Sequence, residues 1–214
     1  MDAVPGTVAL LCVMIGTTSF DGFSNGALWT GENGLAQRLQ DGLVRVGFSQ
    51  EVSLELAYSI GLVAMILLIA GVYRLGVVGM RSIGGGFSAE DLARRFIHTL
   101  IPISFAYVVA HYFSLLAYQS QAMAYLVSDP LGDGSNYLGT ANVTINYNVI
   151  TATGIWYVQV AALVLGHVSG LTLAHDRALV VYDRVRRATR SQYWMLAVMV
   201  AFTSLGLWIL SEGV

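Results

Sequence analysis

The stretch Leu54–Met80, LELAYSIGLVAMILLIAGVYRLGVVGM, decides the fold of this chain. Only Glu55 and Arg74 carry a formal charge in it, and most of the other side chains are apolar. A helix needs about 20 consecutive apolar residues to cross the hydrocarbon core of a bilayer. This stretch is longer than that, so it can cross with some tilt. We therefore predict a transmembrane helix here.

The composition of the whole chain agrees with a membrane environment. Of its 214 residues, 56% are hydrophobic and 11% are charged. An ordinary soluble domain has about a quarter charged residues. Such an apolar excess can be accommodated by lipid, and the net charge of −2 excludes a strongly basic nucleic-acid binder. We expect a lipid bilayer around the protein and no nucleic-acid partner.

Four further apolar stretches complete the predicted architecture. With residues 54–80, they give an all-α, polytopic transmembrane bundle of about five spans in a single domain, residues 1–214. The other spans are predicted at residues 4–20, 96–118, 154–174 and 193–210. The first span is short and ends in the polar run Thr17-Thr18-Ser19. Because the apolar sequence starts so abruptly, we also consider that the chain is part of a longer protein, with preceding helices or another membrane subunit as its partner.

The basic residues, all of them arginine, predict an orientation. Nine of them fall in or beside two loops, and residues 119–153 contain none. Because cytoplasmic loops carry the excess of basic residues, both arginine-rich loops are expected inside. The N-terminus is then inside and the C-terminus outside a bacterial cytoplasmic membrane. Arg38 and Arg45, in the first external loop, run against this pattern.

Three shorter segments have recognisable local patterns. Residues 33–48 place leucines on one side and charged or amide side chains on the other, which predicts an amphipathic helix along the outer interface. Ser88 followed by Asp91 predicts an N-terminal helix cap after the three glycines Gly84–Gly86. In the external loop, Asp129–Gly134 has the composition of a turn.

All four histidines lie on the third and fourth predicted spans: His98 and His111 on one, His167 and His175 on the other. Ionisable groups inside a bilayer are costly, so each is a functional candidate. From the helical rise, His98, His167, His175 and Asp176 are expected to form an inner group, with His111 higher.

Other polar residues accompany the histidines. Ser104, Tyr107, His111, Ser114 and Tyr118 recur at helical spacing and share one stripe. Gly166 and Gly170 flank His167 at the spacing that allows a neighbouring helix to approach closely. Asp21 follows the first span at the outer rim.

This pattern leaves several functions open. Histidines with an aspartate can hold a divalent metal, zinc or iron, that activates water for hydrolysis, with Asp21 or Asp176 as a ligand or general base. A transport or assembly subunit could use the stripe as a path for a proton, a metal ion or a small solute. Haem-based electron transfer is a third interpretation, which the eight-residue spacing of His167 and His175 opposes. The fourth is structural, with the histidines as interhelical hydrogen-bond partners.

Two longer stretches carry a resemblance to a known family. They are RFIHTLIPISFAYVVAHYFS, residues 95–114, and IWYVQVAALVLGHVSGLTLAHDRA, residues 155–178. With TSFDG at 18–22 and SDPLG at 128–132, they resemble bacterial membrane proteins labelled fenitrothion hydrolase. The resemblance implies organophosphate hydrolysis and a match to the C-terminal half of longer proteins. The matching polar positions are Asp21, His98, His111, His167, His175 and Asp176.

Overall fold

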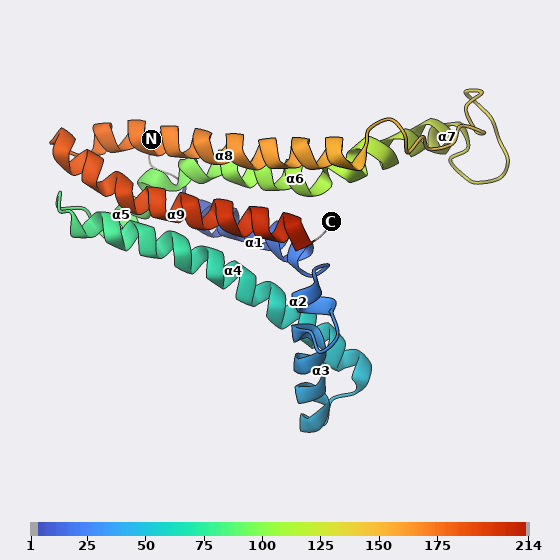
Figure 1. Ribbon diagram of the computed structural model, residues 1–214, viewed down its shortest axis with the longest axis horizontal. Helices are drawn as coiled ribbons and strands as arrows, with labels where there is room; N and C mark the ends of the chain where they lie inside the picture. The colour runs from blue at the N-terminus through green and yellow to red at the C-terminus, as the bar shows by residue number, and fades with distance from the viewer. Residues whose placement is uncertain (1–3, 213–214) are drawn as a thin grey trace. The chain divides into compact units, whose positions relative to one another are not determined.

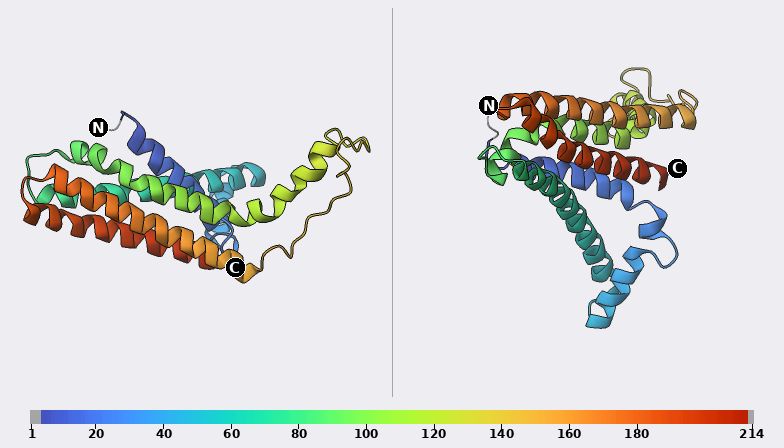
Figure 2. Two further views of the ribbon diagram at one scale, coloured as in Figure 1. Left: turned by 90° about the horizontal axis from the view of Figure 1, so that it is seen from above. Right: turned by 60° about the vertical axis from the view of Figure 1, so that its left-hand side comes forward.

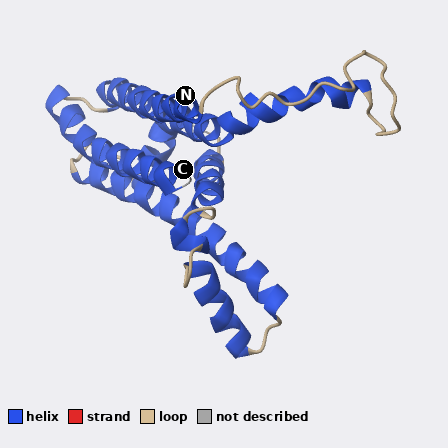
Figure 3. Ribbon diagram, turned by 45° about the vertical axis from the view of Figure 1, so that its right-hand side comes forward, coloured by secondary structure: helices blue, strands red, loops and turns tan. Residues whose placement is uncertain are grey.

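The computed structural model describes residues 4–212, and every regular element in this part of the chain is a helix (Figure 3). The predicted all-α class is confirmed. Four helical segments are long and apolar enough to cross a membrane, and a bent pair of helices can provide a fifth span. By helix length and hydropathy, this is a multi-pass membrane protein.

The helix bounds agree with four of the predicted spans. Residues 54–80 lie within α4 (Gln50–Ser82), residues 154–174 within α8 (Ala152–Val181), and residues 193–210 within α9 (Val185–Glu212). The span predicted at residues 96–118 belongs to a longer helical run, Ala89–Ser128. That run contains α5 (Ala89–Phe96), η1 (Ile97–Leu100), α6 (Ile101–Gln119), η2 (Ser120–Ala122) and α7 (Met123–Ser128).

The first predicted span differs from the others. Helix α1 (Thr7–Phe23) has 17 residues, too few to count as a membrane span by itself. It is long and apolar enough to form a span only together with Ala27–Val46, and the two segments are bent by 67° relative to each other. The bend follows the glycine at position 26, and Ala27–Val46 contains α2 (Ala27–Thr30) and α3 (Leu35–Val46).

The chain divides into two compact units, Met1–Tyr107 with Leu163–Val214, and Val108–Ala162. In the first unit, α4 packs against α1, α3, α5 and α9 (Figure 1). Glycines allow these close approaches. A Cβ atom added at Gly16 of α1 would lie 2.7 Å from the Cα of Ile66 in α4. One added at Gly76 of α4 would lie 2.3 Å from a methyl group of Val198 in α9.

Helix α3 packs along the first turns of α4, as the views in Figure 2 allow the reader to follow. Its buried and half-buried residues, Ala36 and Leu39, belong to a cluster with Phe20, Trp29 and Met65. The helix predicted over residues 33–48 is therefore present, and Ala36 and Leu39 contact protein, while Leu35 and Val46 on it are exposed. Its position in the membrane interface stays a prediction.

The cap predicted at Ser88 is confirmed. The Ser88 hydroxyl accepts a hydrogen bond from the N–H of Asp91 at 3.0 Å, and the Asp91 carboxylate accepts from the N–H of Ser88 at 3.3 Å. Before the cap, Gly84, Gly85 and Gly86 all have positive φ, between 76° and 114°, a conformation that other residues rarely adopt. The cap starts α5. This helix is bound to α4 by the Tyr73 hydroxyl, which donates a hydrogen bond to the Ala93 carbonyl at 2.8 Å.

The second unit, Val108–Ala162, holds the end of α6, α7, the loop at residues 129–151 and the start of α8. Tyr118 donates to the Ile150 carbonyl at 2.9 Å and thereby connects α6 to the end of the loop. The turn predicted at Asp129–Gly134 is present, because the Asp129 carboxylate accepts from the N–H groups of Asp133 and Gly134, each at 3.0 Å. Hydrogen bonds from Ser135 hold the pKa of Asp133 below its ordinary value.

The contact between α1 and α4 gives the first prediction. We expect Gly16→Ala to lower the free energy of unfolding by about 1–3 kcal/mol, because the new methyl group would overlap the backbone of α4. The measurement is thermal or denaturant unfolding of the purified chain in a neutral detergent.

Gly71→Ala, on α4, is the matched control, because an added Cβ there has nothing within 4 Å. It should leave stability unchanged or raise it by up to about 1 kcal/mol through helix propensity. Equal stability of the two variants would contradict the observed packing of α1 on α4.

Candidate functional site

The structure does not assemble the predicted inner group of His98, His167, His175 and Asp176. Among residues 4–212 there is no set of three or more His, Cys, Asp or Glu side chains placed to hold one metal ion. The rotation of α8 gives the physical reason. Eight residues turn a helix by about 80° beyond two full turns and advance it by about 12 Å. His167 is therefore buried between helices while His175 is exposed.

His175 and Asp176 form an exposed pair. Their Nδ1 and Oδ1 atoms are 3.5 Å apart, and the two side chains are 58% and 71% exposed. Such a pair between sequence neighbours contributes little to stability. It has the character of a solvated helix surface.

Asp21 is part of α1, which continues to Phe23. Its side chain is exposed, and its backbone carbonyl accepts hydrogen bonds from Ser24 at 3.0 Å and Asn25 at 2.8 Å. These two bonds satisfy the end of α1 just before the bend. Both bonds use the backbone of Asp21, so they do not depend on its carboxylate.

The two histidines of the third predicted span lie in different units. His98 is half-buried in η1, within the first unit, near the bond that the Arg177 Nε donates to the Arg95 carbonyl at 3.1 Å. His111 belongs to the second unit, where its ring lies 4.6 Å from that of Tyr112, nearly perpendicular to it. In that unit Gln159 donates to the Ala110 carbonyl at 2.7 Å.

His167, on α8, is the most deeply enclosed of the four histidines, with 5% of its surface exposed. Its Nδ1 lies 2.7 Å from the carbonyl oxygen of Leu163, one turn earlier. A carbonyl can only accept, so this bond requires the hydrogen of the neutral ring on Nδ1. Nε2 then carries a free lone pair. It is buried and has no hydrogen-bond partner among the described residues.

Two glycines allow this part of α8 to pack closely against η1 and the first turns of α6. A Cβ atom at Gly166 would lie 2.3 Å from the Cβ of Ala106, and one at Gly170 would lie 2.7 Å from the Thr99 carbonyl. This close approach agrees with the sequence prediction for the glycine pair. It brings α8 against η1 and the first turns of α6, all within the first unit.

Two further buried hydroxyls lie on that facing segment. Thr99 of η1 and Ser104 of α6 are 0% and 3% exposed, and neither hydroxyl has a hydrogen-bond partner in the described part of the chain. Tyr107 differs from them, because its hydroxyl donates to the Phe202 carbonyl of α9 at 2.6 Å. Its ring centre is 6.1 Å from that of His167. We name this packed region of α8, η1 and the first turns of α6, which carries His167, Thr99, Ser104 and Tyr107, the His167 site.

The composition of this site limits its chemistry. A buried polar atom without a partner costs about 1–3 kcal/mol, so its presence calls for an explanation. One neutral imidazole with two hydroxyls can accept a proton or hydrogen-bond a small molecule such as water. Sequence reasoning selected His167, Ser104 and Tyr107 but missed Thr99, which lies outside the stripe at helical spacing. The structure reveals it by the packing of the Thr99 carbonyl against Gly170, which the sequence pattern does not show.

Comparison of the chain with family models, with curated proteins and with solved structures found no match.

The unpartnered Nε2 of His167 gives the second prediction. Replacement by an apolar side chain of similar size removes a buried polar atom that lacks a hydrogen bond. It also removes the bond from Nδ1 to the Leu163 carbonyl, but that carbonyl lies inside α8 and keeps its helical backbone partner. We therefore expect His167→Leu to leave the free energy of unfolding unchanged or to raise it by about 1 kcal/mol. Thermal unfolding of the purified chain in detergent measures this change.

Tyr107→Phe is the comparison, because it removes a hydrogen bond that is formed. It should lower stability by about 0.5–1.5 kcal/mol. A larger loss for His167→Leu than for Tyr107→Phe would mean that His167 has a structural role.

Proposed function

We propose that this protein is a transport subunit of a membrane system, and that His167 is a proton-accepting group within its helical bundle. The single observation that carries the proposal is the buried, unpartnered Nε2 atom of His167. Ionisable residues inside membrane bundles are costly and mark proton relays and substrate paths in many membrane proteins. The Leu163 carbonyl orients the ring and leaves Nε2 to react.

The geometry suits a proton better than a larger solute. Gly166 and Gly170 bring α8 so close to η1 and α6 that an added methyl group would overlap the neighbouring chain. A proton needs no open pore, because it can move between groups that both donate and accept. The hydroxyls of Thr99 and Ser104 do both, whereas the Tyr107 hydroxyl is already committed to the Phe202 carbonyl.

Protonation of His167 would be transient for a physical reason. The charged ring would donate from Nδ1 to Leu163, but its charge would have no carboxylate partner in a medium of low dielectric constant. Burial of an unpaired charge is strongly unfavourable, so the proton is readily released. A group of this kind passes protons on rather than storing them.

The metal-dependent hydrolase that the resemblance implies has weaker support. A catalytic zinc site uses three protein ligands, and no set of three candidate ligands comes together among residues 4–212. Asp21 and Asp176, the two aspartates considered for catalysis, are exposed. The transport proposal needs only the one histidine whose geometry is favourable.

Proton flux into liposomes tests the proposal. The purified chain is reconstituted with a pH-sensitive dye inside, and a potassium diffusion potential drives protons inward. We expect His167→Gln to reduce the flux about a hundredfold, the low end of what a positioned proton-accepting group contributes. Glutamine can still donate to the Leu163 carbonyl, but it cannot take up a proton.

His175→Gln is the matched control, because it makes the same substitution at an exposed position of the same helix. It should leave the flux unchanged. Equal flux for wild type and His167→Gln, with both variants folded by thermal unfolding, would contradict the proposal.

A further inference from the structure

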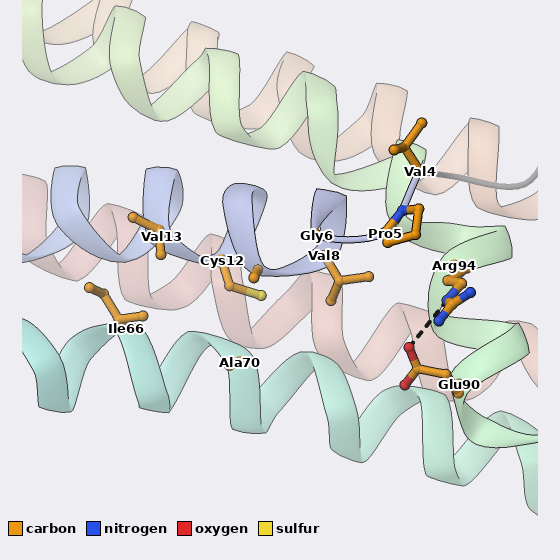
Figure 4. A pocket seen from close by; sticks show the side chains of 11 residues that line it. Val4, Pro5, Gly6, Val8, Cys12, Val13, Ile66, Ala70, Glu90 and Arg94 are labelled. Carbon is orange, nitrogen blue, oxygen red and sulfur yellow. Dashed lines mark hydrogen bonds and ion pairs between the residues drawn. The ribbon is translucent and has the colours of Figure 1, made fainter.

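A cavity of about 420 Å³ lies in the first unit, between α1, α4 and the start of α5 (Figure 4). Most of its lining is apolar: Val8 and Val13 come from α1, and Ile66 and Ala70 from α4. Figure 4 shows these side chains along the two helices, with Cys12 and Ala70 near the middle. The His167 site, on η1, α6 and α8, shares no residue with this cavity.

One end of the cavity is charged. Glu90 and Arg94 of α5 line it there, and the Arg94 Nε lies 3.2 Å from a Glu90 oxygen. The other Glu90 oxygen is 3.6 Å from Arg74 of α4. Two guanidinium groups thus share one carboxylate, which leaves a net charge of +1 at this end. All three side chains are between 44% and 59% exposed, so an incoming anion can reach them.

The cavity fits the shape and charge of an amphiphile with a negative headgroup. On α4 the cavity wall extends over about one turn, from Ile66 to Ala70, a length of roughly 6 Å by the helical rise, and on α1 it extends from Val8 to Val13, roughly 8 Å. An acyl chain along this wall would contact only apolar side chains, and its headgroup would meet the arginines. Basic pockets between transmembrane helices are known binding sites for acidic lipid headgroups.

We infer that the cavity between α1, α4 and α5 is a binding site for an anionic phospholipid. The phosphate accepts hydrogen bonds from Arg94, which lines the cavity, while Arg74 adds a second positive charge beside Glu90, and one acyl chain lies between α1 and α4. Arginine suits this role because its planar group can make two hydrogen bonds to one phosphate. Glu90 holds the two arginines in place while the site is empty and competes with the phosphate for them.

This competition gives variants with opposite expected effects. Arg94→Gln removes one arginine and should weaken binding of phosphatidylglycerol about fivefold. This is the usual contribution of one basic residue to the binding of an acidic lipid. Glu90→Gln removes the competing carboxylate and should strengthen binding by a similar factor. Ala70→Phe fills the apolar part and should weaken binding of the acyl chain.

The experiment titrates phosphatidylglycerol into the purified chain in a neutral detergent and counts retained lipids by native mass spectrometry. Phosphatidylcholine with the same acyl chains is the reference, because it has no net charge. We expect preferential retention of phosphatidylglycerol by the wild type. Arg186→Gln, at an exposed position of α9, is the matched control and should bind as the wild type does.

Three results would overturn the inference. The first is equal retention of the two lipids by the wild type. The second is the same affinity in Arg94→Gln and Arg186→Gln, or weaker binding in Glu90→Gln. The third is a dimer that persists in phosphatidylglycerol and disappears in Ala70→Phe, which would place a second copy of the chain in the cavity.

Discussion

Lipid offers no hydrogen bonds, and the rest of this structure depends on that constraint. Each polar group inside the bilayer must find its partner within the protein or remain at a cost. The described chain satisfies many of them by bonds to backbone carbonyls of other helices. Tyr73, Tyr107 and Tyr182 each donate to such a carbonyl, on α5, α9 and α4 respectively. Several other buried side-chain polar atoms in the described chain also have no partner, but among them only the Nε2 of His167 belongs to an ionisable group.

Glycine provides the second part of the architecture, because burial of apolar surface gives no advantage between helices that lipid already solvates. Association then depends on close van der Waals contact, which small residues permit. Gly16 sets the distance between α1 and α4, and Gly166 with Gly170 sets that between α8 and the chain before it. The second contact also encloses the His167 site. Packing and the candidate function are thus connected through the same two glycines.

The sequence predicted those features that depend on local pattern. Hydropathy located α4, α8 and α9, the Ser88–Asp91 spacing located the start of α5, and the glycine spacing located the close approach of α8. The sequence separated the span at residues 4–20 from the helix at 33–48, but not the angle between them, since the 67° bend is accompanied by tertiary contacts such as that of Phe20 with Trp29, 5.1 Å apart at their ring centres. The inner histidine group was expected from depth, whereas the turn of about 80° between His167 and His175 leaves the first buried and the second exposed. The cavity joins residues from three distant segments, so no single stretch of sequence could reveal it.

The helical run from α5 to α6 contributes residues to both inferred sites. Arg94 marks the charged end of the cavity, and Thr99 and Ser104 follow it on the same helical run. By the helical rise they lie roughly 8 and 15 Å further along that run. If headgroups hold Arg94 at the membrane surface, Thr99 lies just below the interface, buried in the protein, and Ser104 is near the middle of one leaflet. A proton entering at the surface would then meet hydroxyls spaced toward the depth where Gly166 and Gly170 enclose His167. An anionic lipid bound at Arg94 would fix that depth.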